Sequence, residues 1–266
     1  MDAPVLEFQN VEICYDGVPV VRDVSFGVSA GEVACVVGES GSGKSTLLRA
    51  AMGLLGTGGE VSGGSIRLNG QSLADLSERE LRRCCGDDLA MVFQDSLSSY
   101  VPVRRIGDQV WEGLRAHHDV TREDVERRAC ELFERLGLGD ARRVHASYPF
   151  ELSGGMGQRV GIAAALLSEP RVLLADEPTS ALDAVARTQV VELLRTVRCE
   201  LGCAIVLVTH DMRVVRALAD SVMVLRRGLV VEQGLAREVL DAPRETYTQE
   251  LLMAAPRLRM TDEEES

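Results

Sequence analysis

One nine-residue segment, Gly38 to Thr46, constrains the fold of this chain more than any other part of the sequence. It has the sequence GESGSGKST and follows a continuous apolar run, EVACVV at 32–37. Such a run is expected of a strand that is covered on both faces. The residues after it, Lys44 to Met52, have helical character. A glycine-rich loop between a strand and a helix can surround phosphate groups with backbone N–H groups. The sequence therefore predicts an α/β fold built around a phosphate-binding loop.

The polar positions of this loop indicate how phosphates would be bound. Of the 29 basic residues, Lys44 is the only lysine. Its thin stem and compact charge can reach the β- and γ-phosphates, whereas a planar guanidinium is wider. The Ser45 hydroxyl suits Mg²⁺. We expect the whole loop to contact the ligand, and it consists of Gly38, Glu39, Ser40, Gly41, Ser42, Gly43, Lys44, Ser45 and Thr46.

A second apolar run, RVLLAD at 171–176, ends in two consecutive carboxylates. Asp176 is placed to hold Mg²⁺ through water. Glu177 is placed to orient or deprotonate an attacking water molecule. An apolar run that ends in Asp-Glu is common by itself, but together with the phosphate-binding loop it indicates nucleotide hydrolysis.

The order of the predicted elements indicates an α/β core with a helical insert. The first thirty residues have the pattern of strands, and the residues from 106 to 136 have a helical pattern. Thr121 and Asp124 have the spacing of a capping box within that helical segment. Alternating helices and strands follow from about 157 onward. We find neither an internal repeat nor a low-complexity linker.

Charge and hydropathy limit the classes of partner. The chain has 41 acidic and 29 basic side chains, a net charge of −12, which argues against non-specific binding of nucleic acid. No apolar run approaches the roughly 20 residues that span a bilayer, and the N-terminus has no secretory signal pattern. The seven cysteines form no CxxC pair, so we interpret them as buried or idle thiols of a reducing cytoplasm.

Three further groups complete a resemblance to a known family. The segment LSGGMGQRV at 152–160 places a serine and two glycines at a predicted helix start, while Gln94 and His210 each end a strand. Together with the loop and the two carboxylates, this order resembles the ATPase cassette of ABC transporters over nearly the whole chain. The resemblance implies the P-loop NTPase fold of an ABC cassette: a mixed and parallel sheet core, an N-terminal antiparallel β subdomain and an inserted helical subdomain at about 95–165.

The resemblance also implies the domain limits and the cofactors. The nucleotide-binding domain would extend over 5–255 and would be followed by an acidic tail at 256–266. ATP and Mg²⁺ would be the ligands. In this family the serine-glycine signature contacts the γ-phosphate of ATP held by the opposite subunit. Ser153, Gly154 and Gly155 would therefore serve the nucleotide of a partner cassette.

Other roles are implied position by position. Lys44, Asp176 and Glu177 would serve this chain's own nucleotide. Gln94 would touch Mg²⁺ and signal to a membrane subunit, and His210 would hold the γ-phosphate. The resemblance assigns two further residues from their positions in the chain. Tyr15 would stack on adenine, and Asp183 would lie at the dimer contact.

Finer features resemble the subgroup that imports peptides or nickel. They are YPFELSGGM, ADEPTSALD, VVRALAD, VVEQG and the tail motif APRETYTQELL. The chain departs from the subgroup's pattern at several positions: Ser96 and Val101 replace a proline and an asparagine, Gly157 replaces a larger residue, and Glu245-Thr246 replace His-Pro. Ser96 and Val101 lie near the loop that would touch the membrane subunits. They therefore leave the nucleotide chemistry intact, but the identity of the cargo stays undetermined.

We therefore expect an ATP-hydrolysing subunit of an importer at the cytoplasmic face of the cell membrane. Its cargo would be oligopeptides or dipeptides, with nickel or another chelated metal as the alternative. Expected partners are two transmembrane permease subunits, which would dock near Gln94 to Val103, and indirectly an extracytoplasmic binding protein. The second cassette would be a different, related subunit or a copy of this chain. A soluble cassette acting on DNA or ribosomes is the remote alternative, but such relatives carry coiled-coil inserts, zinc clusters or two cassettes. We expect neither a nucleic-acid partner nor an iron–sulfur cluster.

Overall fold

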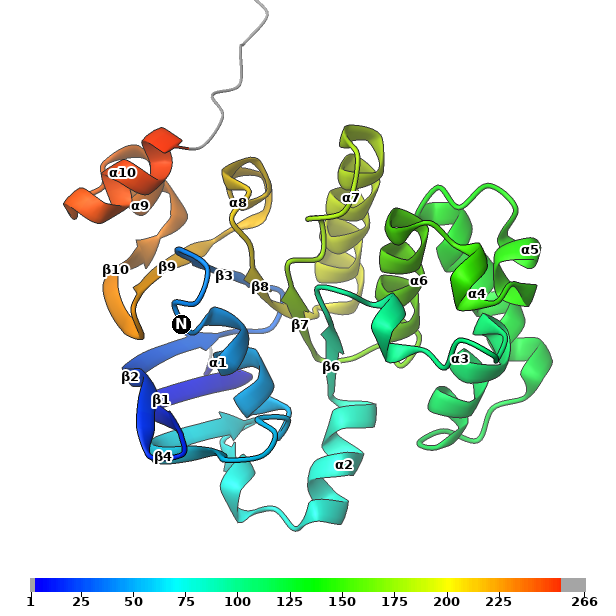
Figure 1. The fold of residues 1–266 in the computed structure, drawn as a ribbon, viewed down its shortest axis with the longest axis horizontal. Coiled ribbons are helices and arrows are strands. Elements are labelled where there is room, and N and C mark those ends of the chain that lie inside the picture. Colours follow the sequence, from blue (N-terminus) through cyan, green and yellow to red (C-terminus); the bar gives the residue numbers. More distant parts are fainter. Residues whose placement is uncertain (1–2, 255–266) are drawn as a thin grey trace, which may run out of the picture.

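The computed structural model describes residues 3–254 and contains two β-sheets with helices around them (Figure 1). The smaller sheet is antiparallel and has the strand order β2-β1-β4-β5. Its strands are β1 (Leu6–Tyr15), β2 (Val18–Val28), β4 (Gly59–Leu68) and β5 (Gln71–Ser72). The antiparallel β subdomain expected from the sequence is therefore present, although β4 and β5 join it from beyond the phosphate-binding loop.

The larger sheet is mixed and has the order β10-β9-β3-β8-β7-β6. Strands β9, β3, β8, β7 and β6 run parallel to their neighbours, and only β10 is antiparallel. Every residue of β3, β6, β7 and β8 is buried, as expected of parallel strands covered on both faces. The strands are β3 (Val33–Val37), β6 (Leu89–Val92), β7 (Val172–Asp176), β8 (Ala204–Val208), β9 (Ser221–Arg226) and β10 (Leu229–Leu235).

Helices cover both faces of the larger sheet, and those of the expected insert form a group of their own at one side (Figure 1). Figure 1 shows α3 to α6 gathered on one side of the molecule, away from the antiparallel sheet of β1, β2 and β4. The helices are α1 (Lys44–Ala51), α2 (Glu78–Asp87), α3 (Ile106–Arg115), α4 (Arg122–Arg135), α5 (Ala141–Ala146), α6 (Gly154–Leu166), α7 (Ala184–Leu201), α8 (Met212–Leu218), α9 (Ala236–Asp241) and α10 (Thr246–Ala254).

The helical segment expected at 106–136 consists of two helices, α3 and α4. The break is explained by capping: the Thr121 side chain accepts a hydrogen bond from the N–H of Asp124 at 3.1 Å and starts α4. Helix α2 was not predicted. It begins with a complete capping box between Ser77 and Glu80, and its few apolar side chains, Leu81, Cys84 and Cys85, are only partly buried against the core.

Two apolar clusters lie on opposite faces of the larger sheet. Alternate residues of β3 show this division, because Val33, Cys35 and Val37 contact one cluster while Ala34 and Val36 contact the other. The first cluster includes the helices of the insert and α7, and the second includes α1 and the antiparallel sheet. The parallel strands are thus held on both faces, which fixes the loops at their carboxyl ends.

All seven cysteines are free. Among the described residues we find no cluster of three metal-ligating side chains. Within residues 3–254, no helix is both long enough and apolar enough to cross a bilayer. The acidic tail expected at 256–266 lies outside the described residues.

Candidate active site

The expected site residues lie where neighbouring parallel strands end. Gly38 directly follows β3 and Glu177 directly follows β7, while Gln94 and His210 lie two residues beyond β6 and β8. These strands are adjacent in the order β3-β8-β7-β6. They bring side chains far apart in sequence to one cavity of about 460 Å³. It is lined by Val20, Gly38, Ser40, Gly41, Gly43, Lys44, Ser45, Thr46, Gln94, Glu177, Val208 and His210.

The glycines of the phosphate-binding loop are required by the backbone. Gly38, Gly41 and Gly43 have φ values of 149°, 79° and 101°, which L-residues rarely adopt. A Cβ atom on Gly38 would also overlap the carbonyl oxygen of Leu225. The loop therefore lies against the sheet with its backbone exposed to a ligand at the N-terminus of α1.

Lys44 is buried, with 8% of its surface exposed. Its Nζ donates to the carbonyl oxygens of Gly38 at 2.9 Å and Glu39 at 2.7 Å. Burial lowers the pKa of Lys44, while the nearby carboxylates, Glu177 first among them, act in the opposite direction. Because the ammonium group is held by neutral carbonyls, its charge is not cancelled by an ion pair and can act on a phosphate.

Ser45 and Asp176 contact each other directly. The Ser45 hydroxyl donates to Oδ1 of Asp176 at 2.8 Å, and Gln94 lines the same cavity. Burial raises the pKa of Asp176, and the hydrogen bond from Ser45 only partly offsets this effect. A hydroxyl, a carboxylate and an amide oxygen form a donor set that fits Mg²⁺. These residues therefore fit the expected metal.

Glu177 and His210 form a second pair. His210 Nδ1 lies 2.8 Å from Oε1 of Glu177, whereas Oε2 of Glu177 is buried without a hydrogen-bond partner. Glu177 also has a left-handed backbone, with φ of 49°. Such strain in a residue other than glycine is found at functional sites. The arrangement pairs one carboxylate oxygen with His210 and leaves the other buried without a partner.

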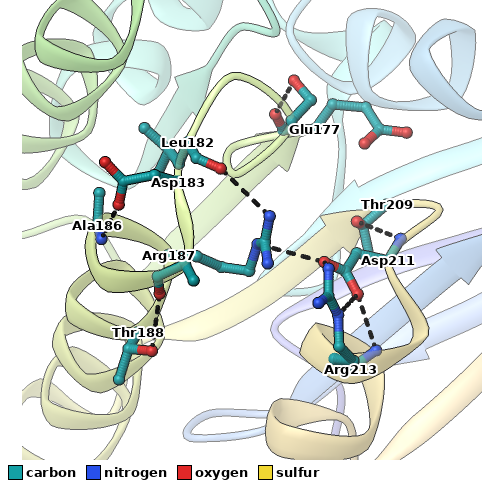
Figure 2. Close-up of polar contacts among 11 residues, drawn as sticks. Glu177, Leu182, Asp183, Ala186, Arg187, Thr188, Thr209, Asp211 and Arg213 are labelled. Carbon is teal, nitrogen blue, oxygen red and sulfur yellow. Dashed lines mark hydrogen bonds and ion pairs between the residues drawn. The ribbon is translucent and has the colours of Figure 1, made fainter. Parts of the chain in front are cut away.

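A network that the sequence analysis missed lies beside this pair (Figure 2). Arg187 on α7 donates to the carbonyl oxygen of Leu182 at 3.2 Å, and its Nε lies 3.3 Å from Oδ2 of Asp211. Asp211 follows His210 and starts α8 by accepting from the N–H of Arg213. Arg187 thus joins the turn before α7 to the segment that carries His210. In the sequence, the only sign of the contact between Arg187 and Asp211 is their opposite charge, and the two residues are 24 positions apart.

Three other expected site elements lie outside the cavity lining. Ser153 caps α6 by accepting from the N–H of Met156 at 3.3 Å, and Gly154 follows it on the surface. Ser153, Gly154 and Gly155 do not line the cavity. Tyr15 ends β1 close to Gly59, also outside the cavity lining. Asp183 caps α7 through the N–H of Ala186 at 2.8 Å and is exposed. Its role at a dimer contact stays a prediction.

Two of the expected loop residues, Glu39 and Ser42, do not line the cavity. Glu39 does not line the cavity, and its N–H donates to Tyr247 Oη at 2.9 Å. Ser42 is buried, with 1% exposure, and its Oγ has no hydrogen-bond partner. The remaining expected loop residues line the cavity, so the structure brings most of the loop together with Gln94, Glu177 and His210.

The chain matches known proteins over most of its length. The family model described as ABC transporter matches residues 21–180. This chain belongs to the ABC transporter family. It is 44% identical to the "Putative peptide import ATP-binding protein" of Brucella melitensis, over 96% of this chain and 78% of that protein. It is 41% identical to the "Probable D,D-dipeptide transport ATP-binding protein" of Escherichia coli K12, over 96% of this chain and 80% of that protein.

Solved structures agree with this assignment. The ABC cassette described here superimposes on the ATP-binding cassette MJ0796, solved as a dimer in a post-hydrolysis state with ADP and Pi, with a TM-score of 0.79. The two are 29% identical, over 87% of this chain and 99% of that chain. The expected cassette fold is therefore confirmed, and the chain is an ATPase of this family.

Two positions at which the cassette departs from its subgroup, Ser96 and Gly157, lie where α6 packs against the segment after β6. A Cβ atom on Gly157 would overlap the Leu97 side chain, and one on Gly161 would overlap the side chain of Ser96. Gln158, which is 2% exposed, accepts from the N–H of Ser96 at 3.3 Å and donates to the carbonyl oxygen of Phe93 at 3.0 Å. Helix α6 thus holds the residues on both sides of Gln94.

Proposed function

We propose that this ABC cassette is the ATPase subunit of a peptide importer. The hydrolytic part of the proposal rests on one observation: Lys44, Glu177 and His210 reach a single cavity from three different loops. The cargo is supported by the names of the relatives, which describe import of peptides and of D,D-dipeptides. These names favour peptides over nickel or another chelated metal.

Each residue has a distinct proposed task. The loop N–H groups and Lys44 would bind the β- and γ-phosphates. Ser45, Asp176 and Gln94 would hold Mg²⁺, which when bound neutralises charge on the phosphate oxygens. The Glu177 carboxylate, which lines the cavity, would accept a hydrogen bond from the attacking water and orient it.

His210 would hold the γ-phosphate through its second ring nitrogen. Because a carboxylate accepts, the hydrogen in the contact with Glu177 belongs to Nδ1 of His210. Nε2 then donates to a phosphate oxygen when the ring carries both hydrogens. The exposed position of His210, with 68% of its side chain accessible, suits a contact with the terminal phosphate of a bound nucleotide.

We propose a dimer with two nucleotides between its cassettes. The signature residues Ser153 to Gly155 would complete the partner's site, and Asp183 would lie at the contact. Tyr15 would stack on adenine. The second cassette would be a different, related subunit, with a copy of this chain as the alternative. Closure is favoured when ATP binds across the pair, and hydrolysis reopens it.

Two permease subunits are the proposed membrane partners of a cassette that extends over 5–255, with its helical subdomain at about 95–165. They would dock at the membrane's cytoplasmic face beside Gln94 to Val103, where Val103 is 80% exposed. A cavity of about 300 Å³, lined among others by Phe93, Tyr100 and Gln109, lies next to this segment. An extracytoplasmic binding protein would deliver the peptide to the permease subunits.

Co-purification tests this proposal. A tagged chain would be expressed in its native cell, membranes solubilised gently, and the captured proteins identified. We expect two multi-span proteins, a second cassette and a peptide-binding protein, whose ligand can then be assayed directly. Capture of a nickel-binding protein would replace peptides by a metal cargo. Capture of ribosomal or DNA-repair proteins without membrane proteins would contradict the transport function but not the proposed ATPase site.

A further inference from the structure

We propose that Tyr247, in the C-terminal tail motif, is a positioning residue for the phosphate-binding loop. Its hydroxyl oxygen accepts a hydrogen bond from the N–H of Glu39 at 2.9 Å, across 208 positions of sequence. The inference goes beyond the proposed transport function, and it rests on the proposed nucleotide site. It gives a task to a motif that the catalytic arrangement leaves unused.

Helix α10 is firmly attached to the larger sheet. The Glu232 carboxylate on β10 accepts from the N–H groups of Arg244 at 2.8 Å and Glu245 at 3.2 Å, just before the helix begins. Thr248 is 1% exposed, and the neighbouring apolar side chains of α10 pack against the core. Figure 1 shows α9 and α10 together beside β9 and β10. The tyrosine therefore projects from an anchored helix.

The Tyr247 ring is held from a second direction. The guanidinium carbon of Arg226 lies 4.5 Å from the ring centroid, a distance at which a cation and an aromatic face attract each other. Arg226 ends β9 and follows Leu225, whose carbonyl oxygen leaves no room for a Cβ atom on Gly38. The hydroxyl group is thus fixed relative to the start of the loop.

One peptide group connects Tyr247 to Lys44. The peptide between Gly38 and Glu39 donates its N–H to Tyr247, and its carbonyl oxygen accepts from Lys44 Nζ at 2.9 Å. Because a peptide is planar, rotation of this group would break both contacts. Gly38 has no side chain whose packing could fix the orientation of this peptide. Tyr247 supplies the missing constraint and so orients the acceptor of the lysine.

The expected effect is that of one hydrogen bond. A neutral hydrogen bond changes an equilibrium constant by roughly 2- to 12-fold. Loss of the hydroxyl leaves the loop free to adopt other orientations, which must be given up when a nucleotide binds. Tyr247→Phe should therefore raise the Kd for ADP by about 3- to 10-fold, while the ring stays over Arg226 and the helix stays docked.

The test compares the purified full-length chain with its Tyr247→Phe and Thr248→Val variants. Calorimetry gives the Kd for ADP, and thermal unfolding gives the melting temperature. Thr248→Val is the matched control, because it perturbs the same helix without touching the loop. Steady-state hydrolysis adds a second readout: the KM for ATP should rise in Tyr247→Phe while kcat stays within about twofold.

A reciprocal measurement follows the helix instead of the nucleotide. If the loop and α10 are coupled, ADP must stabilise the helix as much as the helix stabilises the ADP complex. Hydrogen exchange of the α10 amides should therefore slow when ADP binds, and this slowing should vanish in Tyr247→Phe.

The outcomes separate this inference from the proposed function. An equal Kd for ADP in the wild type and Tyr247→Phe would overturn the inference and leave the nucleotide site standing. An equal rise in Kd in Thr248→Val would also overturn it, because the effect would then come from loosening of the helix. Failure of the wild-type chain to bind ADP would reject the proposed site and the inference with it.

Discussion

His210 Nδ1 lies 2.8 Å from Glu177 Oε1, although the two residues leave the sheet from different strands, β8 and β7. The contact occupies one oxygen of a carboxylate that is 11% exposed and leaves the other oxygen without a partner. Glu177 is therefore buried, while the His210 side chain reaches toward solvent.

We expect Glu177→Gln and His210→Ala each to lower kcat for ATP hydrolysis by about 100-fold or more, the usual effect of losing a general base or a transition-state donor. Glu177→Gln should also accumulate an ATP-bound dimer, detectable by size-exclusion chromatography. Phosphate release and ADP binding are the measurements, and the ADP Kd should change little in both variants. Hydrolysis within about twofold of wild type would remove the substituted residue from its proposed role.

Asp176→Asn should abolish hydrolysis and yet stabilise the nucleotide-free protein. Burial raises the pKa of Asp176 above its usual 3.8, so its ionised form is disfavoured in the folded state. The cost appears as the pH rises from 3.8 through the folded pKa and is fully present above it. Asn removes it and should raise the free energy of unfolding by about 0.5–2 kcal/mol at pH 7.

This gain should shrink as the pH falls toward 3.8, because wild-type Asp176 then becomes neutral as well. Denaturant unfolding at pH 7 and pH 5 measures the difference. A less stable Asn variant at pH 7 would show that the hydrogen bond from Ser45 outweighs the cost of burial.

Gly161→Ala should destabilise the cassette by about 1–3 kcal/mol, since its Cβ would overlap the side chain of Ser96. The matched control is Gly113→Ala in α3, where nothing lies within 4 Å of the added atom. That change should stabilise by about 0.5–1 kcal/mol. Adding Ser96→Gly to Gly161→Ala should restore part of the loss. Equal melting temperatures for Gly161→Ala and the wild type would contradict the overlap.

Arg187→Gln should lower the free energy of unfolding by about 1–2 kcal/mol and reduce hydrolysis several-fold, because Asp211, next to His210, loses a charged partner. Arg195→Gln on the same helix is the control: Arg195 pairs with the exposed Glu192 and donates to the carbonyl oxygen of Ala217 but does not contact Asp211, so we expect a loss of only about 0.5–1 kcal/mol. Chemical unfolding and phosphate release measure both effects. Similar losses of stability and hydrolysis in the two variants would show that Arg187 only stabilises the helix and does not support His210.

The sequence predicted the parts of the site that depend on local order. The phosphate-binding loop needs a strand, three glycines and a helix in succession, and each leaves a local signal. Asp176 and Glu177 were found because an apolar strand ends immediately before them. That Gln94 and His210 share a cavity with Glu177 could be expected, because parallel strands present their carboxyl ends at one edge.

Contacts between distant segments could not be predicted in this way. The fit of Ser96 against Gly161 depends on the distance between a loop and a helix, which no periodicity encodes. The hydrogen bond from Glu39 to Tyr247 joins two segments, and neither segment has a sequence pattern that indicates the other as its partner. Helix α2 was missed because only Leu81, Cys84 and Cys85 mark the side that packs against the core, and none of them is fully buried.

The strand order has a consequence for how this chain folds during synthesis. Strand β3 leaves the ribosome early, but both of its neighbours, β8 and β9, belong to the last third of the chain. Pairing between such distant segments is slow, because a long loop must close before any contact forms. The apolar β3 must therefore wait unpaired, a state that favours aggregation or chaperone binding. The phosphate-binding loop is thus made among the first segments and acquires its native support among the last.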